Sequence, residues 1–522
     1  MKVYEGTILT VDEQDKVAKY LVEDGGRIVF VGDELPKEYK KAKKVKLGKK
    51  ALCPAFVDTH QHFASFALFH AGLNVMDAES NEQILEWAKE FAKRSKDKVL
   101  VAFGASPYSV KEGVLVNREQ LDSVESERPF FLVKYDGHAC VVNTALLNKV
   151  DKIVKNLRGY HPDTGEMNQE AFFAISDYIS KTIPIPTLVK NMQKAIDYQV
   201  GNGIGMVHTV SGVGFPMDMD INLEKWFGRS LQHGVQMRVF SQTMDVKQVI
   251  RRGFPRVGGC FKCALDGCFG SADAALNKPY EGTTDDYGIL FYDDKQVINF
   301  CKKANRAGLQ IQIHAIGDRA FNQATIALKA ALDDYPREDH RHGIIHACLP
   351  TKEGIQICKD YNINLPMQSA FIGWRQEPDE YLQKILGDRA NLLNPLRDIW
   401  DTGILISAGS DGPCTNPDPI AWIDHAVNNS SMPSQSLTVK EALRMCTYNG
   451  YKITFDEKER GSLEVGKIAD MVILSADPYS IPTKELGKLK VEETILGGNP
   501  YKKQNRTVLG AILRGMASKN AI

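Results

Sequence analysis

The sequence has no long hydrophobic run and no excess of charge of either sign. No stretch of about 18 or more apolar residues occurs, so we expect no membrane-spanning segment. Residues Met1–Gly6 carry neither an apolar core nor a cleavage site, so no secretory leader is expected. The 522 residues include 65 lysines and arginines against 65 aspartates and glutamates, which argues against nucleic acid or an acidic membrane as a partner. These features leave an enzyme or a large binding protein, and for an enzyme we expect a small-molecule substrate.

The ten cysteines show no compact spacing of the kind found in disulfide-rich domains. Their scatter indicates reduced thiols and a cytoplasmic location. Cys260 and Cys263 form a Cys-x-x-Cys pair, with Cys268 close by, but no second pair completes a structural zinc site. Two interpretations stay open, packing as small apolar residues and contact with a metal in a nearby site.

Both ends of the chain are rich in short strand patterns, whereas the middle is not. Val3–Val11 alternates between apolar and polar residues, and Val491–Leu496, which two glycines follow, also has a strand pattern. We predict a small β-sandwich domain built jointly by residues 1–50 and 456–522. Residues 51–455 would form the central domain.

The central part alternates short apolar runs with longer helical patterns, which is typical of βα units around a parallel sheet. Eight runs are predicted strands, the number that a closed (β/α)8 barrel needs. They are Leu52–Thr59, Ile204–His208, Gln236–Phe240, Phe261–Leu265, Ile311–His314, Gly343–His346, Asn364–Gln368 and Ile404–Ala408. Residues 65–200 have strand and helix patterns of their own, and we interpret them as a large insertion after the first strand. The predicted class is α/β, a TIM-like barrel with a β-sandwich and this insertion.

Two histidines follow the first predicted strand, in the segment Asp58-Thr59-His60-Gln61-His62. Side chains two residues apart share one face of a strand, so both imidazoles can reach one metal ion. Two ordinary polar residues at a strand end are the alternative. The apolar strand that precedes them favours the metal site.

Three more polar residues lie at the ends of predicted strands. His314 ends the fifth strand, His346 ends the sixth, and Asp411 follows the eighth. Each could be a structural polar residue, but the ends of parallel barrel strands meet at one mouth, where catalytic groups gather. Imidazole and carboxylate ligands suit a divalent transition metal, most often zinc, with manganese or iron as alternatives.

This arrangement resembles the amidohydrolase superfamily, which has His-x-His at strand 1, histidines at strands 5 and 6 and an aspartate at strand 8. The sequence is most similar to the YtcJ-like branch of metal-dependent hydrolases (amidohydrolase family 3). The supporting segments are residues 135–139, 261–267, 314–320, 409–413 and 461–470. The resemblance extends over nearly the whole chain.

The resemblance implies one or two divalent metals bound by His60, His62, His314, His346 and Asp411. In members with two metals, a lysine on strand 4 is carboxylated by carbon dioxide and bridges them. Lys262 lies on the predicted strand 4 and is the candidate for this carboxylated lysine. The alternative is a lysine that pairs with a carboxylate such as Asp266.

The ligands imply the chemistry. A bound metal lowers the pKa of a water molecule so that hydroxide is available near neutral pH. Asp411 would take the proton of that water and deliver it to the leaving group. His138, in the insertion, and His208 and Trp374, near strand ends, are candidates for substrate binding, although His138 could also be a structural loop residue.

Three functions remain to be separated. The first is hydrolysis of a C–N bond in an amide or cyclic amide. The second is deamination of a heterocycle at a one-metal site, but deaminase relatives usually carry a glutamate where this chain has Gly317. The third is a non-catalytic regulatory role, although no ligand position is lost. A homodimer is left open, because dimers are common among such barrels.

Overall fold

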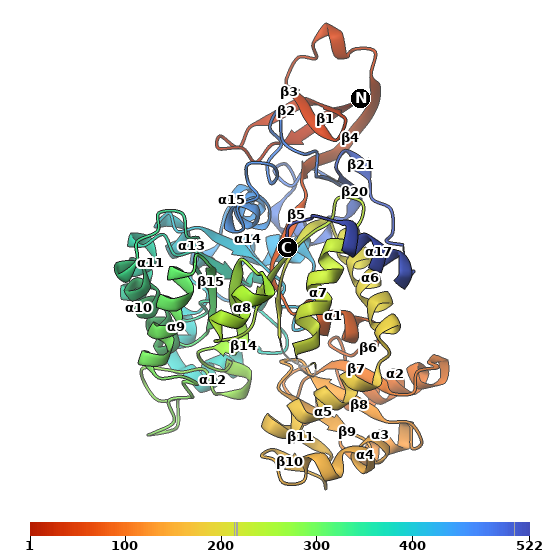
Figure 1. Ribbon diagram of the computed structural model, residues 1–522, viewed down its shortest axis with the longest axis vertical. Helices are drawn as coiled ribbons and strands as arrows, with labels where there is room; N and C mark the ends of the chain where they lie inside the picture. The colour runs from red at the N-terminus through yellow and green to blue at the C-terminus, as the bar shows by residue number, and fades with distance from the viewer. Residues whose placement is uncertain (213–214, 216–217, 506) are drawn as a thin grey trace.

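A computed structural model describes residues 1–522 except 213–214, 216–217 and 506. Three large sheets follow one another along the long axis (Figure 1). Strands from both ends of the chain form the sheet at the top of the view, a parallel barrel-like sheet surrounded by helices lies in the middle, and the insertion lies at the bottom. Among the described residues, no helix is long and apolar enough to cross a membrane.

The central sheet has six parallel strands in the order β5-β12-β13-β14-β15-β16, and β17 and β18 form a separate parallel pair. The strands are β5 (Phe56–Gln61), β12 (Ile204–Ser211), β13 (Gln236–Ser241), β14 (Arg256–Ala264), β15 (Gln310–Ala315), β16 (Gly343–His346), β17 (Leu365–Met367) and β18 (Ile406–Ala408). Bridges from Gly343 to Asn364 and from Gln61 to Gly412 link the pair to the edges of the six-stranded sheet. The sheet is therefore nearly closed, and the predicted α/β class is confirmed.

Each of the eight predicted runs overlaps a strand of the central sheet or of the β17–β18 pair, but the fourth strand begins earlier than predicted, at Arg256 instead of Phe261. The reason is a pair of glycines inside the strand. Gly258 and Gly259 have φ of 122° and 125°, and a Cβ on Gly258 would lie 1.7 Å from the carbonyl oxygen of Gln312. Only glycine allows β14 to approach β15 this closely.

Helices cover the outside of the central sheet (Figure 1). They are α1 (Phe63–His70), α6 (Ile185–Gly201), α7 (Met219–Ser230), α8 (Val246–Arg252), α9 (Asp294–Arg306), α10 (Asp318–Asp334), α11 (Lys352–Asp360), α12 (Asp379–Leu386), α13 (Leu396–Asp401), α14 (Pro419–Val427), α15 (Val439–Cys446), α16 (Tyr448–Ile453) and α17 (Val508–Ala517). Helix α9 shows how the sequence specifies the start and the buried face of such a helix. Asp293 and Gln296 form a capping box at its start, and Val297, Phe300 and Ala304 bury one face in the core.

The insertion forms its own sheet, in the order β10-β11-β9-β8-β7-β6. Its elements are β6 (Leu73–Asn74), α2 (Asn81–Arg94), β7 (Leu100–Ala105), α3 (Arg118–Val124), β8 (Phe130–Lys134), β9 (Ala139–Val142), α4 (Thr144–Val154), β10 (Tyr160–His161), β11 (Glu166–Asn168) and α5 (Gln169–Thr182). Successive side chains of its strands alternate between two cores. Phe130 belongs to one hydrophobic cluster and Phe131 to the other. Both faces of this sheet are therefore buried.

The third sheet combines strands from both ends of the chain, in the order β21-β20-β19-β4-β1-β2-β3. These are β1 (Lys2–Leu9), β2 (Val17–Asp24), β3 (Arg27–Gly32), β4 (Lys43–Pro54), β19 (Met471–Leu474), β20 (Val491–Leu496) and β21 (Asn499–Pro500). Strand β4 pairs with β1 on one side and with β19 on the other. Because β5 follows β4 almost directly, this sheet fixes the start of the barrel strand that carries the two neighbouring histidines.

Candidate active site

The five predicted histidine and aspartate ligands converge at one end of the central sheet. His60 and His62 both direct Nε2 at Asp411 Oδ1, at 3.0 and 3.3 Å. The ring centroids of His60 and His346 are 5.1 Å apart, and those of His314 and His346 are 4.6 Å apart. All five residues are buried.

Backbone contacts hold the loop after β18 against the end of β5. The Asp411 N–H donates to His60 O at 2.8 Å, and the His62 N–H donates to Gly412 O at 2.9 Å. Asp58 on β5 accepts hydrogen bonds from the backbone N–H and the hydroxyl of Ser410, at 2.9 and 2.6 Å. These bonds fix the separation between the first pair of histidines and the aspartate.

Two of the site residues have strained backbones. His346 has φ of 74° and Asp411 has φ of 53°, the left-handed region that residues other than glycine rarely adopt. Each such residue costs on the order of 1–3 kcal/mol, and such strain is concentrated at functional sites. The strain turns both side chains toward the cluster.

Cys260 lies in the middle of this cluster, and the sequence did not identify it as a specific ligand. Its Sγ is 3.2 Å from His60 Nε2, 3.4 Å from His346 Nε2 and 3.3 Å from His314 Nδ1. The pairing of β14 with β15 shifts register between Gly259 and Ala264, and this irregularity directs the thiol inward. The Cys-x-x-Cys pattern was the only signal that could have found it.

Lys262 is the predicted ligand that the structure does not bring to the cluster. Its Nζ donates to Asp218 Oδ1 at 2.5 Å, and its side chain is 49% exposed. Phe261 between it and Cys260 has φ of 47°, which reverses the usual strand alternation. The alternative pairing with Asp266 is not formed either, because Asp266 accepts backbone N–H groups of Ile316 and Gly317.

Neighbouring acceptors determine which nitrogens of two histidines face the cluster. His346 Nδ1 lies 2.6 Å from Gln368 Oε1, and His314 Nε2 lies 3.2 Å from the Gly267 carbonyl oxygen. An N–H that donates to these oxygens leaves the other ring nitrogen with a free lone pair directed at Cys260. This arrangement is the one found around histidines that bind metals.

Burial and contacts set the charges of the site. Burial lowers the pKa of His60 and of His346, so both imidazoles are neutral and able to act as ligands. Burial alone would raise the pKa of Asp411, but hydrogen bonds from His60 and His62 outweigh it and hold that pKa well below its usual range. Burial raises the pKa of the Cys260 thiol well above its usual value. Neutral imidazoles around an ionised carboxylate form a donor set that fits a divalent transition metal.

A cavity of about 690 Å³ opens onto the cluster. Much of its wall is apolar, and carboxylates such as Asp136 and Glu377 also line it. The aromatic side chains in the wall come from the insertion and from the loops of the barrel, and they are Phe69, Phe103, Phe131, Phe172, Phe173, Phe215, Phe261, Phe269, Phe291, Tyr292, Phe371 and Trp374. The cavity is therefore suited to an apolar ligand.

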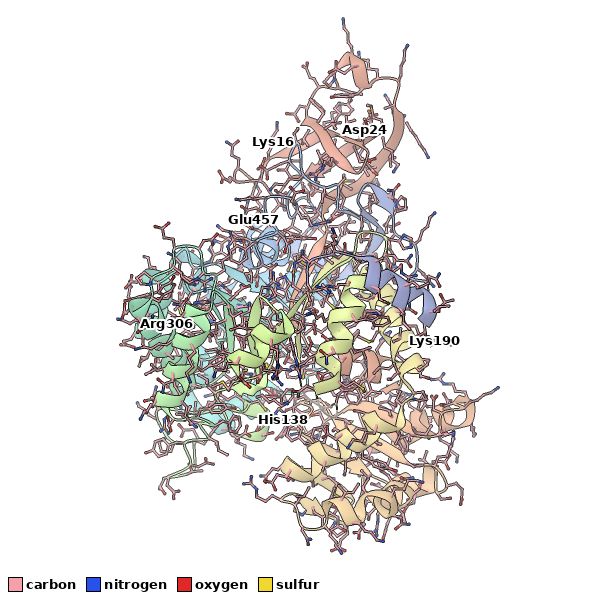
Figure 2. All side chains as sticks on the ribbon, viewed as in Figure 1. Lys16, Asp24, His138, Lys190, Arg306 and Glu457 are labelled. Carbon is pink, nitrogen blue, oxygen red and sulfur yellow. The ribbon has the colours of Figure 1, made fainter. Side chains whose placement is uncertain are left out.

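Of the predicted substrate residues, His138 and Trp374 line this cavity and His208 does not. His138 lies where the insertion meets the barrel (Figure 2), and its Nδ1 is 2.8 Å from the Asp136 carbonyl oxygen. Trp374 stacks on Phe371, with centroids 4.9 Å apart. His208 instead lies 3.1 Å from the Thr454 hydroxyl, in the buried interior.

The chain resembles known proteins over most of its length. The model of a family described as amidohydrolases matches residues 45–501. A putative amidohydrolase, YtcJ, of Bacillus subtilis is 26% identical and covers 94% of this chain and 97% of its own. An N-substituted formamide deformylase of Arthrobacter pascens is 25% identical, and the match covers 95% of this chain and 97% of its own. An uncharacterised metal-dependent hydrolase from Pyrococcus furiosus superposes with a TM-score of 0.74 at 22% identity, over 92% of this chain and 100% of its own.

The fold and the buried site define an α/β metal-dependent hydrolase. The chain belongs to the amidohydrolase family, as the sequence predicted. The predicted class of enzyme, a hydrolase of carbon–nitrogen bonds, is thereby confirmed.

Proposed function

We propose that His60, His62, His314, His346 and Asp411 hold one or two divalent metal ions, with zinc as the expected metal. The observation that carries this proposal is the direction of the side chains. His60 and His62 aim at one oxygen of a buried, ionised carboxylate, and the other two imidazoles aim at the same space. Buried polar groups converge in this way when a cation completes the site.

The proposed reaction is hydrolysis of an amide or cyclic amide. The metal supplies a nucleophile near neutral pH, because it lowers the pKa of a water molecule. Asp411 accepts the proton of that water and passes it to the leaving nitrogen, for which its ionised state is required. The aromatic wall excludes bulk water, and His138 and Trp374 are proposed to contact the substrate.

The cavity favours an uncharged substrate with an apolar or aromatic group. Its aromatic walls offer a bulky hydrocarbon group extensive contact, whereas an isolated charge there would lose its hydration. The similarity to an N-substituted formamide deformylase suggests formamides as the first compounds to examine.

The finer architecture is also a proposal. We infer an eight-stranded (β/α)8 barrel, since the bridges at Gly343 and Gln61 connect β17 and β18 to the six-stranded sheet. We infer a β-sandwich domain from residues 1–50 and 456–522, because strands of both segments pair in one sheet and Tyr4, Leu47 and Ile495 contribute to a single hydrophobic cluster. Residues 51–455 form the barrel domain, with the insertion at 65–200.

The ten free cysteines support a reducing, cytoplasmic setting.

The deaminase alternative is disfavoured by the position where its glutamate would stand. A Cβ on Gly317 would lie 2.1 Å from the carbonyl oxygen of Ala275, so a larger residue does not fit without moving the backbone. The regulatory alternative is disfavoured because every predicted histidine and aspartate ligand is present in the cluster.

A substrate panel with controlled metal content tests this function. The protein is stripped of metal, reloaded with Zn²⁺, Mn²⁺ or Fe²⁺, and assayed for benzylamine release from N-benzylformamide and N-benzylacetamide and for ring opening of phthalimide to phthalamic acid. We expect metal-dependent hydrolysis of at least one of them, and loss of that activity in His60→Asn but not in the exposed control His161→Asn. Hydrolysis that persists in metal-free protein, or ammonia release from heterocycles alone, would contradict the proposal.

The contribution of the insertion to substrate selection has its own test. Phe173 lines the cavity and packs against Phe261, with ring centroids 5.8 Å apart. Phe173 is half-buried, so a bound benzyl group can pack on it, and losing that contact forfeits up to about 1.5–3 kcal/mol. Phe173→Ala is therefore expected to raise KM for benzyl substrates roughly 10- to 100-fold, with a smaller effect on formamides with short alkyl groups. Equal effects on both would show that the aromatic wall does not select the substrate.

A further inference from the structure

We propose that Cys260 is a metal ligand shared by two neighbouring metal positions, in place of a carboxylated Lys262. This inference rests on the proposed metal centre but not on the identity of the substrate. The site contains two groups of ligand atoms, each gathered within 4.8 Å. One group is His60, His62, Cys260 and Asp411, and the other is Cys260, His314 and His346. Cys260 is the member that both groups share.

The spacing around the sulfur agrees with metal coordination. Three imidazole nitrogens lie 3.2–3.4 Å from Sγ, and they come from three different strands, β5, β15 and β16. With Zn–S of about 2.3 Å and Zn–N of about 2.0–2.1 Å, a tetrahedral zinc separates sulfur and nitrogen ligands by about 3.6 Å. Small movements of the side chains therefore suffice for metals to enter between the sulfur and the histidines.

The backbone around Lys262 directs this lysine away from the position that Cys260 occupies. The Tyr292 hydroxyl donates to the Lys262 carbonyl oxygen at 2.8 Å, and the Lys262 ammonium is paired with Asp218 at 2.5 Å. The intervening Phe261 ring packs edge-on against His62, with centroids 5.0 Å apart.

A bridging thiolate preserves the charge balance of the site. The thiol loses its proton to solvent when the sulfur binds, so Cys260 contributes one negative charge. A lysine carbamate would contribute the same charge. The cysteine needs no carbon dioxide, so the formation of the centre should not depend on bicarbonate.

The test uses the full chain loaded with Co²⁺, whose bonds to thiolates give a charge-transfer absorption in the near ultraviolet. We expect this band in the unaltered protein and in Lys262→Gln, each with two cobalt ions per chain. Cys260→Ser should lose the band and bind the second ion at least tenfold more weakly. Cys263→Ser, which changes a buried cysteine on the same strand, should keep both.

X-ray absorption of the unaltered protein loaded with Zn²⁺ provides a second readout that needs no variant. We expect a Zn–S distance of about 2.3 Å. A zinc coordination shell of nitrogen and oxygen alone would overturn the sulfur bridge and leave the proposed function intact. The same holds if Lys262→Gln fails to bind the second metal and the unaltered protein binds it only when bicarbonate is present. A chain that binds no metal would overturn both.

Discussion

The two ends of the barrel interior both bury charged and polar side chains, but they satisfy them differently. Away from the active site, Arg238 Nε donates to Asp456 Oδ2 at 2.9 Å, and Arg256 donates to the carbonyl oxygen of Ile522 at 2.7 Å. At the mouth, four imidazoles, a thiol and a carboxylate face one another. The two arginines of the first group donate to oxygen acceptors, whereas the imidazoles, the thiol and the carboxylate of the second group gather around a common space.

This difference separates structural polar groups from functional ones. His208 belongs to the first kind, because it pairs with Thr454 near the buried arginines. His60, only on a neighbouring strand, belongs to the second, since its Nε2 faces Asp411 and Cys260. The direction in which a buried histidine points is therefore more informative than its position at a strand end.

The largest expected effect follows from changing Asp411 at the mouth. Asp411→Asn removes the group that accepts the proton of the attacking water, so kcat should fall by about 10³-fold, within the range for loss of a general base. The melting temperature should also fall, because the amide cannot replace the ionised carboxylate that accepts hydrogen bonds from His60 and His62. Steady-state kinetics with thermal unfolding measures both. Activity within tenfold of the unaltered protein would remove Asp411 from the mechanism.

The next effect concerns the matched pair at the other end. Arg238 and Asp456 are only 4% and 15% exposed, and breaking such a buried pair costs about 3–5 kcal/mol. Arg238→Met should therefore lower the free energy of unfolding by that amount in denaturant titrations. Metal content and kcat of the remaining folded protein should be unchanged. The double variant Arg238→Met/Asp456→Leu should recover part of the loss, and a loss of metal in either variant would contradict the separation of the two ends.

A smaller effect distinguishes two buried carboxylates whose pKa values are shifted in opposite directions. Burial, with the nearby Asp220 charge, raises the pKa of Glu224 to about 8 from an ordinary value of 4.5, whereas contacts with histidines lower that of Asp411. Folded protein thus holds a proton on Glu224 that the unfolded chain releases between pH 4.5 and 8. Stability should therefore decline as pH rises through this window, by at most about 1.4 kcal/mol per pH unit.

Glu224→Gln cannot release this proton, so its melting temperature should decline less between these pH values. Melting curves of both proteins across the same buffers measure the difference. Parallel pH profiles would show that Glu224 is already ionised in the folded state.

The smallest effect is expected for His208. His208→Gln should leave kcat and KM within about twofold and lower stability by about 1 kcal/mol, the contribution of one hydrogen bond. His138→Gln, which changes a residue on the cavity wall, should raise KM instead. A tenfold rise of KM in His208→Gln would show that the substrate reaches the interior beside Thr454.

Much of this site could be predicted from sequence, because parallel strands bring their ends together whatever their exact bounds. His60, His314, His346 and Asp411 are close in space for that reason. Trp374 was placed on the cavity wall by its position after the seventh strand. The sheet that joins both ends of the chain was indicated by the strand patterns near both termini.

The fourth strand could not be predicted in the same way. The orientation of Cys260 and Lys262 depends on the irregular pairing after Gly259 and on the positive φ of Phe261, which strict alternation does not reveal. Likewise, Gln368 supports His346 through a contact between separate strands that no local pattern encodes. Residue types at strand ends are visible in the sequence, whereas local backbone irregularities are not.

The most direct test of the metal centre is a crystal structure of the zinc-loaded protein with anomalous scattering measured at the zinc edge. The account predicts peaks within bonding distance of His60, His62 and Asp411 and of His314 and His346, with Cys260 between them. Peaks elsewhere, such as beside Asp136 and His138, or no peak among these side chains, would contradict it.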